Sequence, residues 1–261
     1  MLDGSHYFAL FAGYAAAMAG AIAARKFYPQ AWPGYSGESF RHPWREFGYA
    51  LIAVVGVVLV GQLYQRGFRL PTVGPWSTLA ECANQILIFS PMIVLLIVRR
   101  HSPETAWLPR RNIVVHVATG IVLACIAIIV FMAIRHGPSF VFAGLGRVVR
   151  PANADKLVQV FLEDFAIAIL MVRLGAALRL RVLAAVVVAF LFSAGHIPAM
   201  VSEGAGISEL ARLLVDFGLA SIVLLTVQRT ASIWWFVWVH FAMDMMQFVH
   251  ATDLGQNLLN Q

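Results

Sequence analysis

Eight long apolar runs constrain this chain more than any other feature of its sequence. Each run has about the 20 residues that an α-helix needs to cross the hydrocarbon core of a bilayer. Each is also continuous rather than alternating, which favours helices over the strands of a membrane barrel. The runs cover residues 7–24, 47–65, 78–98, 113–134, 157–177, 182–200, 208–227 and 232–250. The sequence therefore predicts an all-α polytopic membrane protein, a bundle of about eight transmembrane helices.

The composition agrees with lipid as the solvent. Of the 261 residues, 60% are hydrophobic and 12% are charged, and the mean hydropathy is +0.77. Soluble domains carry about 25% charged residues, and disordered chains are far less apolar than this one. We therefore expect residues 1–261 to form a single integral membrane domain without a soluble part.

Basic residues border the apolar runs and form no stripe, although the net charge is +6. This placement is typical of loops beside a membrane, so we expect membrane lipid and no nucleic acid as a partner. The loops that follow alternate runs hold 12 Lys and Arg on one side and 7 on the other. Because the more basic side faces the cytoplasm, the sequence predicts a multi-pass protein of a bacterial inner membrane with both termini outside. The first run has no basic region before it and is predicted to be a span rather than a cleaved signal peptide.

Ionisable residues inside the apolar runs need an explanation, because a charge in hydrocarbon costs several kcal/mol. They are Glu81, His116, Glu163, Asp164, His196, Asp216, His240 and Asp244. A helix rises about 1.5 Å per residue. On that measure Glu163, His196, His240 and Asp244, from three different runs, lie about 8 to 14 Å below the same membrane face. We expect these four side chains to meet in one layer of the bundle.

Local spacing supports a site in this layer. His240 and Asp244 are four residues apart and share one helix face, as do Phe192 and His196. The small residues of 193–195 allow a neighbouring helix to approach closely. Pro198 is predicted to end or kink its helix just after His196.

These residues resemble the three motifs of a known family. Glu163-Asp164, Phe192-x-x-x-His196 and His240-x-x-x-Asp244 are similar to the EExxxR, FxxxH and HxxxN/D motifs of the CPBP intramembrane endopeptidases, also called Abi or CAAX prenyl protease type II-like proteins. The resemblance covers residues 157–250, which would be the motif-bearing core. The first half of the chain is similar only in being helical.

The resemblance implies a hydrolase, an intramembrane protease that cleaves a membrane-associated peptide or protein with an activated water. Carried over by position, Glu163 would be the general base, and His196 would help to bind the water. His240 and Asp244 would stabilise the oxyanion. An ionised Asp244 would repel an oxyanion, so its carboxyl must be protonated, paired with His240 or bound to metal. Alternatively, Glu163, His196, His240 and Asp244 would hold a zinc ion, as in a metalloprotease, and the sequence leaves both versions open.

The first motif is altered. The family has Glu and Arg where this chain has Asp164 and Ala168. Without the arginine, Asp164 needs another partner, and we interpret it as a structural acid that supports the site together with Phe192. Arg212 is the better candidate for that partner because of its depth in the membrane, near the outer end of its run, and Asp216 lies one helical turn below it.

Two other functions remain open. The altered motif is compatible with a catalytically degenerate family member that acts as a structural or assembly subunit of a larger membrane complex. The buried acids could also belong to a transporter or a proton relay. No pair of Gly- or Pro-broken helices in matching halves of the chain supports the transporter.

Overall fold

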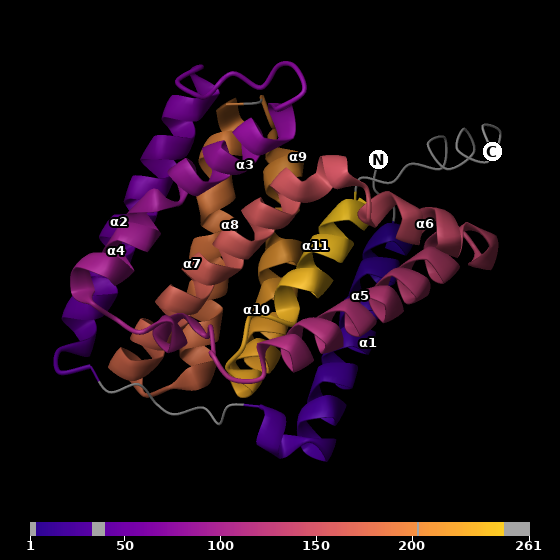
Figure 1. The fold of residues 1–261 in the computed structure, drawn as a ribbon, viewed down its shortest axis with the longest axis horizontal. Helices are drawn as coiled ribbons and strands as arrows, with labels where there is room; N and C mark the ends of the chain where they lie inside the picture. Colours follow the sequence, from indigo (N-terminus) through magenta and orange to yellow (C-terminus); the bar gives the residue numbers. More distant parts are fainter. Residues whose placement is uncertain (1–3, 33–39, 203, 248–261) are drawn as a thin grey trace.

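Helices form nearly all of the regular structure of this protein. The computed structural model describes residues 4–32, 40–202 and 204–247, and no strand occurs within these ranges. Short 3-10 turns connect some of the helices (Figure 1). The α-helices are α1 (Gly4–Phe27), α2 (Pro43–Gln65), α3 (Ser77–Ile88), α4 (Ser90–Arg99), α5 (Ile113–Arg135), α6 (Val141–Val148), α7 (Ala154–Leu178), α8 (Arg181–Ser202), α9 (Ile207–Leu210), α10 (Leu213–Thr230) and α11 (Phe236–Gln247).

Each of the eight apolar runs corresponds to helix, with one clear break. The run 78–98 is divided into α3 and α4, which meet at a bend of 53°. Pro91 explains the break, because it has no N–H group that could donate a helical hydrogen bond to the carbonyl of Leu87. The hydroxyl of Ser90 donates to that carbonyl instead, at 2.7 Å. The run 232–250 becomes helical only at Phe236, and its residues 248–250 lie outside the described residues.

Five helices are long and apolar enough to cross a membrane, namely α1, α2, α5, α8 and α10. The bent pair α3–α4 makes a sixth if it counts as one span. The protein is therefore an all-α, multi-pass integral membrane protein. By length and composition the described residues provide fewer spans than the eight that the sequence predicts, because α7 carries several charges and α11 has only 12 residues.

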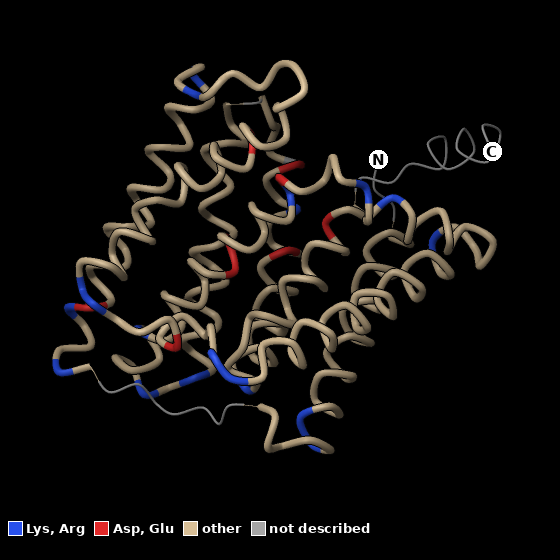
Figure 2. Tube along the Cα trace, viewed as in Figure 1, with Lys and Arg blue, Asp and Glu red and all other residues tan. Residues whose placement is uncertain are grey.

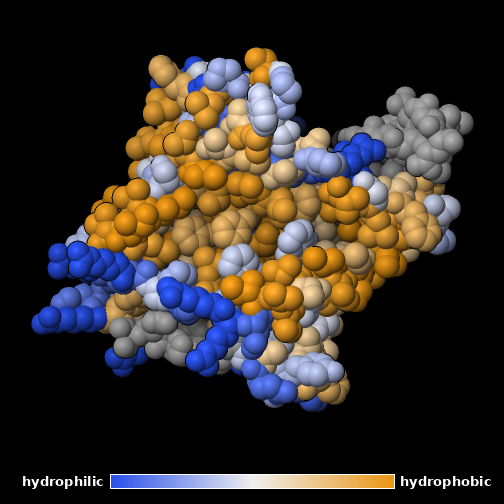
Figure 3. Space-filling view, in the orientation of Figure 1, coloured by the Kyte–Doolittle hydropathy of each residue, from blue (hydrophilic) through white to orange (hydrophobic). Residues whose placement is uncertain are grey.

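Helices α7 and α11, which fail this test, are buried inside the bundle. Helix α7 packs against α2, α3, α8 and α11, and most of its second half is buried. Lipid-facing helices show the opposite pattern, since Ile52, Val55 and Leu59 of α2 are all exposed. A hydrophobic band crosses the face seen in Figure 3, and basic residues gather towards the ends of the bundle in Figure 2. The neighbouring helices thus shield the acids of α7 from hydrocarbon, which lowers the cost of keeping them.

Helix α11 is held in place by a close backbone contact at its start. A Cβ atom added to Gly120 of α5 would lie 2.5 Å from the carbonyl oxygen of Trp235 and 2.7 Å from its Cα. The side chain of Trp235 is fully buried, and its indole N–H donates to the hydroxyl of Thr230 at 2.9 Å. Only glycine lets α5 approach this segment so closely.

We expect Gly120→Ala to destabilise the protein by about 3 kcal/mol, since backbone atoms of Trp235 cannot move aside as a flexible side chain would. Thermal unfolding in detergent measures the effect. Gly48→Ala in α2 is the matched control, because a Cβ at Gly48 meets no atom within 4 Å. The control should be about 0.5 kcal/mol more stable than the wild type, because alanine favours a helix more than glycine does. Equal stability of the two variants would contradict the proposed contact.

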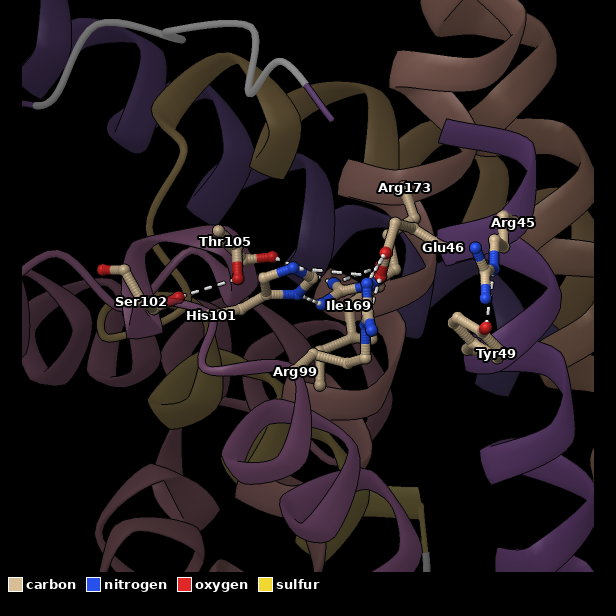
Figure 4. A network of polar contacts seen from close by, with 9 residues as sticks. All are labelled: Arg45, Glu46, Tyr49, Arg99, His101, Ser102, Thr105, Ile169 and Arg173. Carbon is tan, nitrogen blue, oxygen red and sulfur yellow. Dashed lines mark hydrogen bonds and ion pairs between the residues drawn. The ribbon is translucent and has the colours of Figure 1, made fainter. Parts of the chain in front are cut away.

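A buried arginine anchors the far end of α7 (Figure 4). Arg173 is fully buried and donates to the carbonyls of Ile169 and Thr105, at 3.2 and 3.4 Å. It also donates to Nδ1 of His101 at 2.9 Å. The other ring nitrogen of His101 lies 3.8 Å from the carboxylate of Glu46. Glu46 in turn pairs with Arg99, so that α2, α4, α7 and the segment after α4 are tied together.

This network should make stability depend on pH through His101. Burial and the nearby Arg173 guanidinium lower the pKa of His101. Because the pKa is lower in the folded state, protonation of His101 favours unfolding. The contribution of His101 to stability is therefore complete above its pKa in the unfolded state, about 6.5, and is lost as the pH falls through its pKa in the folded state. We expect the unfolding temperature to fall between pH 7.5 and 5, and His101→Gln, which still offers Arg173 an acceptor, to remove part of this fall. An unchanged slope in the variant would show that other groups cause it.

Candidate active site

Seven of the residues selected from the sequence line one cavity. Its volume is about 390 Å³, and α1, α7, α8, α10 and α11 contribute to its wall. We call it the α10–α11 cavity. The seven residues are Glu163, Asp164, Phe192, His196, Asp216, His240 and Asp244. The layer expected from helical rise is therefore where the structure brings these side chains together.

His240 lies between two carboxyl groups. Its Nδ1 is 2.9 Å from Oδ1 of Asp164, which is 2% exposed. Its Nε2 is 3.6 Å from Oδ1 of Asp244, one turn further along α11. The ring of Phe236 stacks on the imidazole at 5.5 Å, and the ring of Phe192 approaches its edge. These contacts fix the orientation of the imidazole and place the carboxyl of Asp244 beside its second nitrogen.

A chain of hydrogen bonds orients Glu163. The side-chain amide of Gln159 donates to Oε1 of Glu163 at 2.9 Å, and the ammonium group of Lys156 donates to Oε1 of Gln159 at 3.2 Å. The three residues lie on one face of α7, three and four residues apart. Gln159 was not predicted to belong to the site, although its position four residues before Glu163 places both side chains on one helix face.

His196 presents one ring nitrogen to the cavity. Its Nδ1 lies 2.9 Å from the carbonyl oxygen of Phe192. Because a carbonyl only accepts hydrogen bonds, Nδ1 carries the proton, and in the neutral ring Nε2 is left as an acceptor. Of the two outcomes predicted for Pro198, an end of the helix is wrong, since α8 continues to Ser202, and a kink stays a prediction.

A second cavity meets the first at Glu163 and His196. It has a volume of about 490 Å³ and is lined by α2, α3, α7 and α8, and we call it the α2–α3 cavity. Five residues line both cavities, namely Gln159, Glu163, Ile167, Phe192 and His196. Aliphatic side chains such as Val54, Val57 and Leu191 form much of the wall of the α2–α3 cavity. Glu163 and His196 therefore lie where the two cavities adjoin.

The structure gives Asp164 a different partner from the one that the sequence suggested. His240 takes the place proposed for Arg212, and Arg212 is not among the residues that line the cavity. Ala168 is fully buried in the hydrophobic core, where a charged side chain would have no space without rearrangement. His116 is also structural, because it contacts the carbonyl of Ala31 and the hydroxyl of Ser232 within the core.

The described residues do not form a ready zinc site. Across residues 4–32, 40–202 and 204–247, no group of three or more His, Cys, Asp or Glu is arranged to hold a metal ion. Glu163, His196, His240 and Asp244 share the cavity wall, but one nitrogen of each histidine is already engaged. Nδ1 of His240 contacts Asp164, and Nδ1 of His196 contacts the carbonyl of Phe192. Zinc binding therefore stays a prediction.

One comparison with known proteins gives a match. Residues 154–246 match the family model described as type II CAAX prenyl endopeptidase, Rce1-like. The matched segment begins with α7, ends within α11 and contains all three motifs. No curated protein and no solved structure matches the chain.

Proposed function

We propose that this chain is an intramembrane endopeptidase of the Rce1-like, CAAX type, whose family model residues 154–246 match, and that it hydrolyses a peptide bond of a membrane-associated peptide or protein. The observation that carries the proposal is the position of Glu163 and His196 at the junction of two cavities. A substrate chain that enters both cavities would cross between these two side chains.

The nucleophile in this proposal is a water held by Glu163 and His196. The water donates one hydrogen bond to the carboxylate of Glu163 and one to Nε2 of His196, so that a lone pair of its oxygen faces the scissile carbonyl. Glu163 takes the proton as the water oxygen bonds to the carbonyl carbon. Gln159 occupies one carboxylate oxygen of Glu163 and thereby leaves the other for the proton.

The developing negative charge needs a donor, and His240 can supply it. A ring that donates from both nitrogens is an imidazolium, and the carboxylate of Asp164 beside Nδ1 balances its charge. Nε2 of His240 would then donate to the oxyanion, and the carboxyl of Asp244, 3.6 Å from the same nitrogen, would be protonated so that it does not repel this charge. When the C–N bond breaks, Glu163 returns its proton to the leaving amine, and a carboxylate and an amine are the products.

Hydrolysis by water can be tested directly. Purified protein in liposomes would be incubated with a library of membrane-spanning peptides in water enriched in ¹⁸O. We expect cleavage products whose new C-terminal carboxylate contains one ¹⁸O atom, detected by mass spectrometry. A folded protein that cleaves no peptide of the library would contradict the proposal.

The same assay tests zinc. If the metal version holds, a chelator abolishes cleavage and added zinc restores it. If Glu163 and His196 act without metal, cleavage is the same in the presence of the chelator.

A second candidate function, a structural or assembly subunit of a larger membrane complex, is favoured by Ala168 in the first motif. The contacts of the two acids weaken the case for a structural subunit. His240 lies beside Asp164 and Gln159 donates to Glu163, so that neither acid of the motif needs the arginine. The subunit function predicts a stable complex with other membrane proteins and no cleavage.

A further inference from the structure

Asp216 is a carboxylate of the α10–α11 cavity that matches no motif of the family. The other three carboxylates of the cavity have polar neighbours. Gln159 donates to Glu163, and His240 lies beside both Asp164 and Asp244. Within the described residues, the side-chain carboxylate of Asp216 has no hydrogen bond or ion pair, whereas its backbone N–H donates to the carbonyl of Arg212.

The cavity has more negative than positive groups. Its wall carries four carboxyl groups, and its basic residues are Lys156, His196 and His240. Lys156 is exposed at the start of α7 and donates to Gln159. His240 is held between two of the acids. His196 lines the same wall, and its Nδ1 is directed to the carbonyl of Phe192.

Two buried polar atoms in the same wall also lack a hydrogen-bond partner among residues 4–32, 40–202 and 204–247. They are Oγ of Ser193, a residue 5% exposed, and Oδ2 of Asp164, which is 2% exposed. Both residues line the α10–α11 cavity. Buried polar atoms are rarely left without a hydrogen bond, and both of these atoms can accept one. Together with Asp216 they form a set of acceptors that suits a cation with several N–H donors.

We propose that the α10–α11 cavity binds a cationic side chain of the substrate, a lysine or arginine near the scissile bond, and that Asp216 determines this specificity. The inference rests on the proposed endopeptidase function. An ammonium or guanidinium group has three or five donors, which can reach the carboxylate of Asp216 and the hydroxyl of Ser193. A neutral side chain would leave these acceptors unpaired, so it would be selected against.

The test compares two membrane peptides that differ at one position near the cleavage site, lysine in one and the neutral isostere norleucine in the other. We expect the wild type to cleave the lysine peptide with a kcat/KM about 10- to 100-fold higher, the range for a charge-assisted hydrogen bond. Asp216→Asn should reduce this ratio to about one, and Asp216→Lys should favour a peptide with glutamate at that position. Asp155→Asn is the matched control, because Asp155 lines neither cavity, and it should keep the wild-type ratio.

Binding separates failure of this inference from failure of the proposed function. The dissociation constants of both peptides are measured for Glu163→Gln and for Glu163→Gln/Asp216→Asn, whether or not the wild type cleaves. Preference for lysine in the first variant and its loss in the second support the subsite, even if no cleavage is found. Equal affinity of Glu163→Gln for the two peptides, or the same loss for both peptides in the double variant, would overturn it.

Discussion

Glu163→Gln should lower peptide cleavage by about 1,000-fold, the largest effect on activity that we expect from one substitution. A general base accelerates a reaction by about 100- to 10,000-fold, and an amide cannot take a proton from water. The substitution keeps the shape of the side chain. It also keeps an oxygen that can accept the hydrogen bond from Gln159. We therefore expect kcat to fall while the unfolding temperature in detergent stays within a few degrees of the wild type.

The control for this variant is Glu81→Gln. Glu81 lines the α2–α3 cavity but not the α10–α11 cavity, and its carboxylate accepts from Asn84. Loss of a carboxylate there should leave most of the cleavage activity. If Glu163→Gln cleaves as fast as the wild type, Glu163 is not the base, and the assembly-subunit function becomes the better explanation of the fold.

The fold could be predicted from the sequence to the level of its helices. Continuous apolar runs marked the long helices but not the short α6, and the 1.5 Å rise placed Glu163, His196, His240 and Asp244 in one layer. The burial of α7 and α11 could not be predicted in the same way. Lipid and protein interior are equally apolar, so hydropathy does not distinguish a helix that faces lipid from one that faces other helices.

The partners of the site residues were harder to predict than their depth. Asp164 meets His240 across 76 residues of sequence, and helical spacing reports only on neighbours three or four residues apart. Gln159 lay within that range of Glu163 and could have been found. A proline does not always end a helix, since α3 and α4 meet beside Pro91 at a bend of 53°, whereas α8 continues past Pro198 to Ser202.

Removal of His240 should have the second large effect, on both stability and activity. His240→Ala leaves the buried carboxylate of Asp164 without its hydrogen-bond partner. An unpaired buried charge costs about 3 kcal/mol, and loss of an oxyanion donor lowers kcat by about 100-fold or more. Unfolding in detergent and peptide cleavage measure the two losses separately.

The double variant Asp164→Ala/His240→Ala distinguishes the structural contribution of His240 from its chemical one. Removing both partners also removes the unpaired charge, so stability should recover by at least half of the loss in the single variant. Cleavage should stay as low as in His240→Ala, because no donor to the oxyanion has been restored. Recovery of cleavage along with stability would mean that His240 only holds α7 against α11. If stability does not recover, the hydrogen bond to Asp164 is not the reason for the loss.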